Sequence, residues 1–459
     1  MRHSKGWCRA QQKDSRKREL LAGKAMICSL DLAKKRHAFH VLDEDRKCIA
    51  RGRVPHSLEG VEQLLEQLEL LRGQRGCERI VFFMEGASHF WMPIASLLER
   101  KGYAYRLVQN RAVKHQRHVA GQSGHKNDPI DADNIGALAS ALHFTFTRLP
   151  RREEWILLRA RACEYQELVD LITAEKNRTH ALLETVLPGY YDIFVDPFKE
   201  SALAVLQTLP RARELDEEAF VACVREVFVG KCLLVKRCRA VWAHIHSNDP
   251  WGYIEARGAL FERVAVVTER LQVLLRQQIQ LRERLVVVYR QIPYARNLDS
   301  ISGSSPVENA VLLGVLGDPK EFDDSRTLVR VAGLDPSERS SGEFQGRTPI
   351  TKAGRARLRR AAVSAAMSVL RSRKNPDFVR RFFYLQTRAD KPLKALQALC
   401  ACASKYLRTA WWLCTKDETY SSEIASQGIP WAKHDRSEDI GEHCVGADDK
   451  ETEFMIQSR

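Results

Sequence analysis

The stretch Ile27-Cys-Ser-Leu-Asp-Leu-Ala33 is apolar except for Ser29 and Asp31, and it predicts a buried β-strand. Working outward along the chain, strand and helix patterns alternate with turn residues. The predicted elements are strands at 37–42, 47–54, 79–84 and 103–108 and helices at 57–73 and 89–101. Three consecutive strands followed by alternating helix and strand predict an α/β sheet with an antiparallel edge.

Four carboxylates stand out in this region. Asp31 lies inside an apolar strand, where an unpaired charge is costly, and Glu85 follows a strand at the end where sheet-based sites form. Asp128 and Asp131 occur in Lys126-Asn-Asp-Pro-Ile-Asp-Ala132 and could simply cap a helix, an alternative that stays open for this pair. Four converging acids would repel one another unless a cation such as Mg²⁺ or Mn²⁺ neutralised them, and such ions can bind a phosphodiester.

The basic charge belongs to the body of the chain. Lysine and arginine total 73 against 58 acidic residues, a net charge of +15. Residues 1–25 carry a net charge of +6 and residues 417–459 carry −7, so the segment 26–416 carries +16. The densest stretch, 345–381, holds eleven Lys or Arg against Asp377 alone. Such a block predicts binding of a polyanion, most commonly nucleic acid, and a solvated helix face is the alternative.

Length and composition narrow the class of protein. With 459 residues, 44% of them hydrophobic, the chain is long enough for two or three folded domains and is not generally disordered. No apolar run approaches the roughly 18 residues of a membrane span. The N-terminus does not read as a secretory signal, so a cytoplasmic, nucleoid-associated protein is expected. The twelve cysteines form no CxxC pair, which favours reduced thiols and disfavours a zinc site.

Residues 152–290 are poor in strand signals and predict long helices, the first over 153–187 and the last over 257–290. Along the last helix, apolar residues recur every seven residues in two series, with Gln278 as the one polar exception. The first series is Val264, Leu271, Gln278 and Leu285, and the second is Val267, Leu274, Leu281 and Val288. The repeat is typical of a coiled coil and predicts oligomerisation, and an intramolecular helical hairpin that buries the same stripe is the alternative.

The C-terminal half contains a glycine-containing turn and a serine-rich loop. Residues 298–313 place the turn before an apolar helix, and such turns can present backbone N–H groups to a phosphate. Ser340-Ser341-Gly342 lies in a basic loop before an arginine-rich helix over 355–371. A serine there could expose its hydroxyl beside a phosphate, although most loop serines only stabilise turns.

The order and spacing of these motifs resemble those of the DEDD-type insertion-sequence transposases, a family of bridge-RNA-guided recombinases that also includes the pilin-gene invertase. The resemblance covers about residues 26–415. It is carried by Leu30-Asp31-Leu-Ala-Lys34, Met84-Glu85-Gly86, Lys126-Asn-Asp-Pro-Ile-Asp-Ala132, Ala332-Gly-Leu-Asp-Pro336, Ser341-Gly342, Thr351-Lys-Ala-Gly354 and Leu358-Arg359. Two positions depart from the family pattern: Asn127 replaces a threonine, and Gly303-Ser304-Ser305 replaces a Gly-apolar-Gly turn.

The resemblance implies a RuvC-like, ribonuclease-H-type α/β domain, a helical coiled-coil middle and a mostly α-helical transposase domain. The implied divisions are the RuvC-like domain 26–150, the helical linker 151–292 and the transposase domain 293–416. The charge pattern adds a basic mobile leader 1–25 and an acidic mobile tail 417–459. The four acids Asp31, Glu85, Asp128 and Asp131 would be catalytic and would hold Mg²⁺ or Mn²⁺, and Ser341 would be the nucleophile. The implied partners are donor and target DNA, a structured guide RNA, and further copies of the chain in a dimer or tetramer.

The expected function is therefore a DNA transposase that cuts and rejoins DNA through a covalent serine–DNA intermediate. Nucleic-acid contacts are expected from the basic residues Arg339, Arg347, Lys352, Arg355, Arg357 and Arg359. Covalent catalysis conserves the energy of the phosphodiester bond, and the sequence contains no P-loop for ATP. Two alternatives remain: a metal-dependent junction-resolving nuclease that uses only the acids and water, and a non-catalytic nucleic-acid-binding protein of transposase descent.

Overall fold

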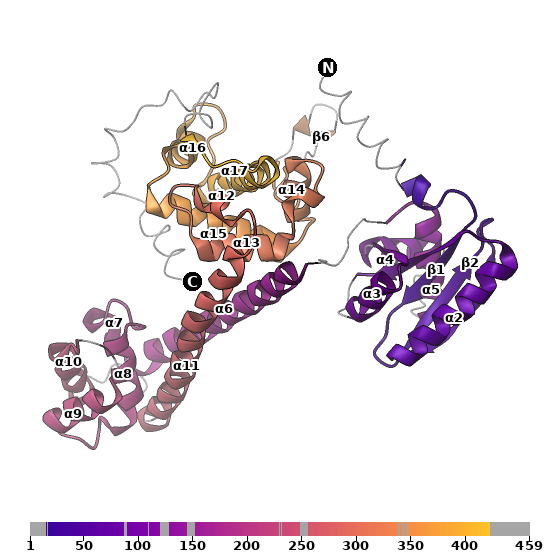
Figure 1. Cartoon of the computed structure of the whole chain (residues 1–459). Coiled ribbons are helices and arrows are strands. Elements are labelled where there is room, and N and C mark those ends of the chain that lie inside the picture. Colours follow the sequence, from indigo (N-terminus) through magenta and orange to yellow (C-terminus); the bar gives the residue numbers. More distant parts are fainter. Residues whose placement is uncertain are drawn as a thin grey trace. The chain divides into compact units, whose positions relative to one another are not determined.

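The structure is a computed structural model. It describes residues 15, 17–86, 90–108, 110–119, 128–144, 152–228, 230, 232–247, 256–337, 340–341, 344–345 and 348–422. The chain divides into two compact units, residues 1–149 and 150–459 (Figure 1). Most of the predicted basic leader and acidic tail lies outside the described residues. Leu21, inside the predicted leader, is buried in the core of the first unit.

The first unit is built around a five-stranded sheet. Its elements are β1 (Ala25–Asp31), β2 (Arg36–Leu42), β3 (Cys48–Pro55), α2 (Leu58–Arg75), β4 (Arg79–Glu85), α3 (Trp91–Arg100), β5 (Ala104–Val108), α4 (Asn110–Val119) and α5 (Asp128–Ser140). The strand order is β3-β2-β1-β4-β5. The strands β1, β4 and β5 are parallel, whereas β2 and β3 pair antiparallel. The predicted α/β sheet with an antiparallel edge is confirmed.

Helices cover both faces of this sheet because successive strand residues point to opposite sides. On one face Cys28 and Leu30 of β1 share a hydrophobic core with the apolar residues of α2 and α3. On the other face Ile27 shares a core with Ile135 and Leu138 of α5. The sheet is therefore the middle layer, and α5 packs closely enough that a Cβ at Gly136 would lie 3.1 Å from Ser29 Oγ.

The end of α2 corrects one prediction. The helix begins after Ser57, whose hydroxyl accepts a hydrogen bond from the Gly60 N–H at 3.1 Å, but it does not end at Gly73. It continues to Arg75 and ends at Gly76, which has the left-handed φ of +64°. The Cys77 N–H then donates to the Arg72 carbonyl. Of the two nearby glycines, only Gly76 adopts the backbone conformation that closes a helix.

In its described residues, the second unit is helical apart from a small two-stranded sheet. Its elements are α6 (Glu153–Val186), α7 (Tyr190–Ile193), α8 (Glu200–Thr208), η1 (Leu209–Arg211), α9 (Glu217–Val227), α10 (Val235–His246), α11 (Arg257–Arg290), α12 (Ala295–Asp299), α13 (Pro306–Leu316), η2 (Pro319–Glu321), α14 (Ser325–Ala332), β6 (Ser340–Ser341), β7 (Phe344–Gln345), α15 (Ala356–Ser372), α16 (Pro376–Thr387) and α17 (Ala395–Lys416). None of the described helices is long and apolar enough to span a bilayer.

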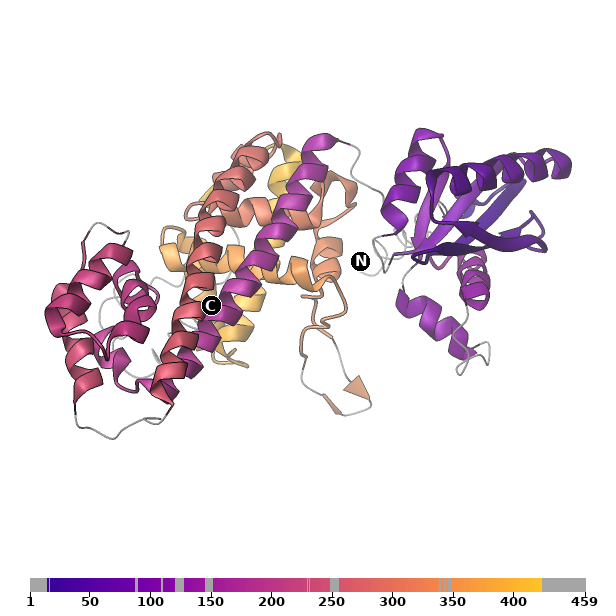
Figure 2. The same cartoon turned by 90° about the horizontal axis from the view of Figure 1, so that it is seen from below.

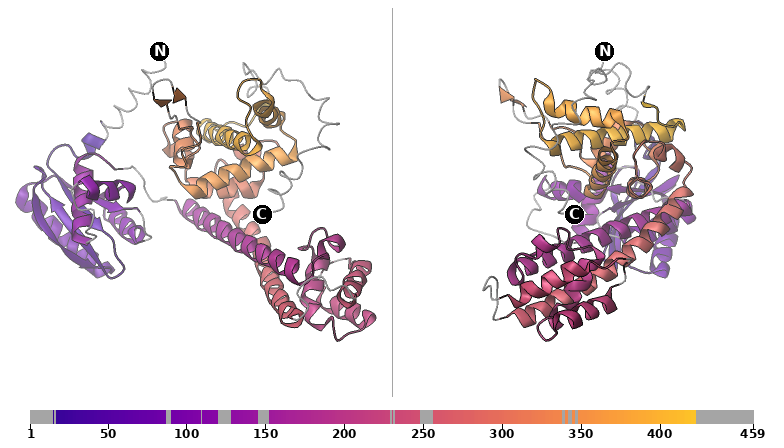
Figure 3. Two further views of the ribbon diagram at one scale, coloured as in Figure 1. Left: turned by 180° about the vertical axis from the view of Figure 1, so that it is seen from behind. Right: turned by 90° about the vertical axis from the view of Figure 1, so that its left-hand side faces the viewer.

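The two longest helices of this unit, α6 and α11, lie side by side and antiparallel (Figures 1 and 3). Leu158 near the start of α6 shares a core with Leu285 near the end of α11, and Leu183 shares one with Val264. The repeat predicted to form a coiled coil is thus buried against α6 of the same chain. Its polar member Gln278 hydrogen-bonds to Tyr165 of α6. The intramolecular helical hairpin is the arrangement present, so this repeat alone is no evidence for an oligomer.

Each end of the α6–α11 pair carries its own group of helices. The short helices α7 to α10 enclose one core with the end of α6 and the start of α11. At the other end, α13 is buried along its whole length among α6, α11 and α15. The largest core of the unit surrounds α13 and supports the segments around the serine-bearing strand β6.

Candidate active site

Two of the predicted acids lie at the same edge of the sheet. Asp31 is the last residue of β1 and Glu85 is the last residue of β4. These strands are parallel neighbours, and their register pairs Leu30 with Met84, the residues immediately before the two acids. The pleat places Asp31 on the side of Ser29 and Glu85 on the side of Phe83, the face covered by α5. Both carboxylates are half-buried.

The first turn of α5 brings a third acid to this edge. The Ser29 hydroxyl, two residues before Asp31 on the same face, donates to the Ala132 carbonyl at 2.8 Å. Asp131 precedes Ala132 and is buried. The N-terminal turn of α5 therefore sits against the carboxyl end of β1. The backbone of Asp128 opens α5, but its side chain lies outside the described residues, as does Asn127.

Asp131 is held by a cation that belongs to the chain. Its Oδ1 lies 2.9 Å from Nε of Arg117 in α4, and the two side chains are only 7% and 17% exposed. Among the described residues, no group of three or more His, Cys, Asp and Glu side chains is close enough together to hold a metal ion. The donor set of carboxylate oxygens still fits Mg²⁺ or Mn²⁺, and the guanidinium of Arg117 supplies positive charge to one member of it.

Two histidines that sequence reasoning did not single out support the turn after Asp31. The Ala33 N–H donates to Nδ1 of His37 at 3.1 Å, and Nε2 of His37 lies 2.8 Å from Nδ1 of His56. Burial, and the neighbouring His56, lower the pKa of His37 to about 4. The neutral His37 ring thus helps to fix the backbone that follows Asp31. The only sequence signal was a histidine beginning a strand pattern, which is too common to be diagnostic.

The predicted nucleophile lies in a hairpin of the second unit. Ser341 is in β6, where it pairs with Phe344 of β7, and Figure 2 shows these strands standing away from the helices. The side chains of Ser340 and Ser341 lie outside the described residues, and so do Arg339 and Arg347. The structure therefore places the backbone of Ser341.

The hairpin is fixed at its base by a short set of hydrogen bonds. The Ser337 N–H donates to the Pro349 carbonyl at 2.8 Å, and the Thr351 N–H donates to the Asp335 carbonyl at 2.9 Å. The Thr351 hydroxyl also donates to the Asp335 carboxylate at 2.7 Å. A Cβ at Gly354 would lie 2.3 Å from the Val331 carbonyl oxygen, so only glycine permits this approach. The motifs Ala332–Pro336 and Thr351–Gly354, which flank the serine loop, thus join to form its base.

The basic residues next to the hairpin divide into two kinds. Arg359 donates to the Ala332 carbonyl at 3.0 Å, so its guanidinium has a structural partner. Arg357 forms an ion pair at 2.7 Å with Glu167 of α6 but is 50% exposed. Lys352 and Arg355 are exposed. Their role in nucleic-acid binding stays a prediction, and the exposed three are better placed for it than Arg359.

The glycine-containing turn at 298–313 has an internal role. Gly303 has a φ of +79°, and a Cβ there would lie 1.8 Å from Ser372 Oγ. The Ser304 N–H donates to the Ile301 carbonyl, and the Ser304 hydroxyl donates to the Leu298 carbonyl at 3.2 Å. The Ser304 N–H is therefore used inside the fold and is not available to bind a phosphate.

Comparison with protein families agrees with this geometry. A DEDD-type IS110 transposase model matches residues 28–188, and a model described as transposase of the IS116/IS110/IS902 family matches residues 295–382. No curated protein matches the chain.

Together the two matches cover more than half of the chain: the first spans most of the sheet unit and α6, and the second spans α12 to the first half of α16. The first is of a RuvC-like domain and contains the four acids, and the second contains Ser341. DEDD-type domains typically use divalent metal ions. The chain therefore carries both transposase domains of the IS110 family, and it is a DNA transposase.

Proposed function

We propose that this transposase joins DNA strands through Ser341, with a divalent ion held by the four acids Asp31, Glu85, Asp128 and Asp131. The observation that carries the proposal is the sheet register that sets Asp31 beside Glu85 at the N-terminal turn of α5. Carboxyl ends of parallel strands are where sites in such sheets form. A bound Mg²⁺ or Mn²⁺ would neutralise the carboxylates and stabilise the negative charge that develops on a reacting phosphate.

The covalent step belongs to Ser341. Its Oγ forms a bond to the DNA phosphorus while the bond from phosphorus to the 3′ oxygen breaks. The serine hydroxyl loses its proton and the released 3′ oxygen gains one, so the step is balanced without a co-reactant. A 3′-hydroxyl from another strand then attacks the phosphoserine and regenerates the free serine. The energy of the phosphodiester bond is kept throughout, which is why no ATP is required.

The hairpin geometry supports this assignment. Ser341 stands in a strand pair that projects from the helices, where DNA has access to it (Figure 2). Lys352, Arg355 and Arg357 are exposed near its base and favour contact with the phosphate backbone. Arg339 and Arg347 belong to the same proposal by their place in the sequence.

The guide RNA and the oligomer are parts of the same proposal. The net charge of +16 on residues 26–416 is suited to a second polyanion besides DNA. Val266, Val273 and Val287 lie at multiples of seven residues along α11 and are 52%, 40% and 61% exposed. A second copy of the chain could cover this outer stripe, because the inner stripe is already buried by α6. The relation to bridge-RNA-guided serine recombinases and to the pilin-gene invertase rests on the motif resemblance.

The proposal is tested with the full chain, labelled DNA spanning an element end, and the structured RNA encoded beside the gene. On a denaturing gel, wild type and Ser340→Ala should give a protein-linked DNA band and Ser341→Ala should not. Omitting the RNA should abolish the choice of site. A band that persists in Ser341→Ala refutes the nucleophile. Hydrolysed ends without any protein-linked band would indicate the junction-resolving nuclease instead.

A further inference from the structure

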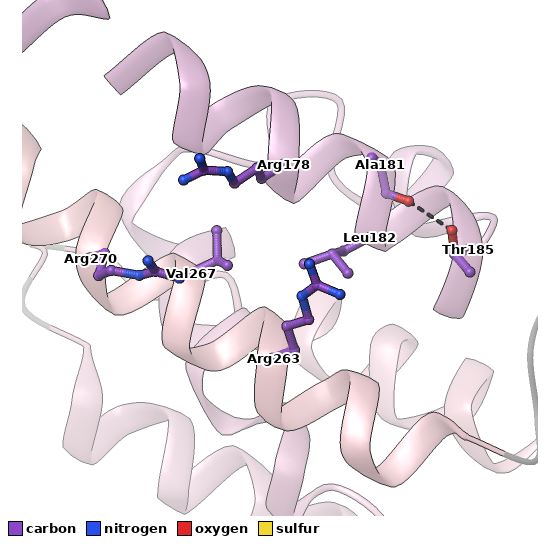
Figure 4. A pocket seen from close by; sticks show the side chains of 7 residues that line it. All are labelled: Arg178, Ala181, Leu182, Thr185, Arg263, Val267 and Arg270. Atoms are coloured by element: carbon purple, nitrogen blue, oxygen red, sulfur yellow. Dashed lines mark hydrogen bonds between the residues drawn. The ribbon is translucent and has the colours of Figure 1, made fainter. Parts of the chain in front are cut away.

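A pocket of about 510 Å³ lies between α6 and α11, and three arginines line it (Figure 4). Its lining residues are Arg178, Ala181, Leu182 and Thr185 of α6 and Arg263, Val267 and Arg270 of α11. We call this the α6–α11 arginine pocket. It contains none of the acids and none of the hairpin residues discussed above.

The pocket has an excess of positive charge. Among the described residues no acid lines it, and Glu175 contacts two of its arginines: the Glu175 Oε1 lies 2.6 Å from Arg178 Nη1 and 4.0 Å from Arg270 Nη1. The Glu175 side chain is 10% exposed, whereas those of Arg178 and Arg270 are 57% and 56% exposed. One buried carboxylate thus faces two of the three guanidinium groups, those of Arg178 and Arg270. The groups remain open to solvent and to a ligand while the carboxylate that offsets part of their charge lies beneath them.

Arg263 has no ion-pair partner among the residues that the structure describes. The positions three and four residues away on its own helix hold only apolar residues, namely Ala259, Leu260, Val266 and Val267. Figure 4 shows its guanidinium directed from α11 toward Leu182 and Thr185 of α6. Val267 beside it is buried and apolar. An anion bound there would meet a cation next to a wall of low polarity, which strengthens the attraction.

We propose that the α6–α11 arginine pocket binds a backbone phosphate of nucleic acid without reading the base sequence. The guanidinium group matches the spacing of phosphate oxygens and can donate two parallel hydrogen bonds to them. The net charge of three arginines and one glutamate is suited to a phosphodiester. Because α6 and α11 are long packed helices, the phosphate would be held on a rigid support.

The ligand chemistry is a phosphodiester, and its source is either DNA or the guide RNA. The inference rests on the chain being a DNA transposase and does not depend on the proposed chemistry of Ser341. Binding is therefore measured with the full chain in the absence of divalent ions, where no strand joining takes place. Failure of the serine proposal leaves this measurement unaffected.

Two variants test the pocket and two matched variants control for them. Arg263→Ala removes the unpaired guanidinium, and Thr185→Glu adds a carboxylate to the pocket while keeping every arginine. Arg276→Ala removes an exposed arginine of α11 that does not line the pocket, and Thr185→Gln has the size of the glutamate without its charge. Thermal melting of all four variants monitors folding. The probes are a mixed-sequence single-stranded RNA and a duplex DNA of the same sequence, titrated over a series of KCl concentrations.

Arg263→Ala and Thr185→Glu should each weaken binding of at least one probe by roughly 3- to 10-fold, as expected for a charge-assisted contact at a solvent-exposed site. The slope of log affinity against log salt should fall by about 0.9 for duplex DNA or about 0.7 for RNA. Loss confined to one probe assigns the phosphate to that nucleic acid. Wild-type affinity and slope for both probes in both variants would overturn the proposal, and so would equal losses in Arg276→Ala and Thr185→Gln.

Discussion

The carboxylate edge of the first unit and the serine hairpin of the second hold their reactive groups in different ways. Asp31 and Glu85 end strands of seven residues that are paired on both sides and buried between helices. Ser341 lies in a strand of two residues whose one partner, among the residues that the structure describes, is β7. The acids are therefore positioned by the core of a sheet, and the serine is positioned by the base of its hairpin.

This difference assigns different roles to the neighbouring residues. At the carboxylate edge, nearby side chains such as Arg117 and His37 set charge and fix turns, because the register already fixes position. At the hairpin, residues between four and ten positions from the serine, such as Ser337 and Thr351, hold the base. Substitutions near the acids should therefore change chemistry or stability locally, whereas substitutions at the hairpin base should act on the serine from a distance.

The largest effect is expected at the carboxylate edge. Asp31→Asn removes a charge from the proposed metal site and should lower DNA strand joining by about 10²- to 10³-fold, the range seen when one group that stabilises the transition state is lost. Strand joining is measured under saturating DNA and Mg²⁺. Asp45→Asn, in an exposed turn of the same unit, should retain activity. Equal activity in the two variants would remove Asp31 from the reaction.

A loss of stability is expected next, at the buried ion pair. Arg117→Ala leaves the Asp131 carboxylate buried without its cation and should lower the free energy of local opening by about 3 kcal/mol. Hydrogen exchange of the amides in β1 and α5 measures this. Lys114→Ala, at an exposed position of the same helix, is the control. If both variants exchange alike, the pair does not hold α5 against the sheet.

The histidine pair gives this edge a pH dependence. The pKa of His37 is lowered from 6.5 to about 4 by burial and by His56, so the unfolded chain takes up a proton at a higher pH than the folded chain. The contribution of His37 to the free energy of unfolding is therefore complete above about pH 6.5, and it falls by at most about 3 kcal/mol as the pH drops toward 4.

Urea unfolding of the first unit, followed by NMR signals of β1 and β2, tests this pH dependence. His37→Gln cannot titrate and should flatten it. A slope that is unchanged in His37→Gln would assign the acid sensitivity to other groups.

The smallest effect is expected at the hairpin base. Thr351→Val keeps the side-chain shape but removes the hydroxyl that donates to the Asp335 carboxylate at 2.7 Å. The yield of protein-linked DNA should fall roughly 10-fold, since a hydrogen bond to a charged group is lost. Thr387→Val is the matched control, because that exposed hydroxyl donates to the Phe383 carbonyl of its own helix. Equal yields would mean that the base does not position Ser341.

Local patterns predicted the fold well, and contacts between distant segments were beyond them. The five strands and the bounds of α11 follow from apolar spacing within each element. The seven-residue repeat of α11 correctly indicated a buried stripe but could not identify α6 as its partner, because spacing records only that a partner exists. The end of α2 was misplaced because a glycine in the sequence does not reveal its φ.

The candidate site divides in the same way. Asp31 and Glu85 were predictable as acids at strand ends, and the pairing of β1 with β4 brings them together. Arg117 was not predictable, since it meets Asp131 only after α4 and α5 fold together. The roles proposed for Asp128 and Ser341 rest on the motif resemblance.

The most direct test of the account is to identify the amino acid that becomes linked to DNA. The full chain is incubated with labelled DNA and its RNA, and the protein–DNA adduct is digested and analysed by tandem mass spectrometry. We expect a nucleotide attached to Ser341, and no adduct from Asp31→Asn. Attachment to Ser340 or to any other residue, or a full yield of adduct from Asp31→Asn, would contradict the joint action of the carboxylate edge and the hairpin serine.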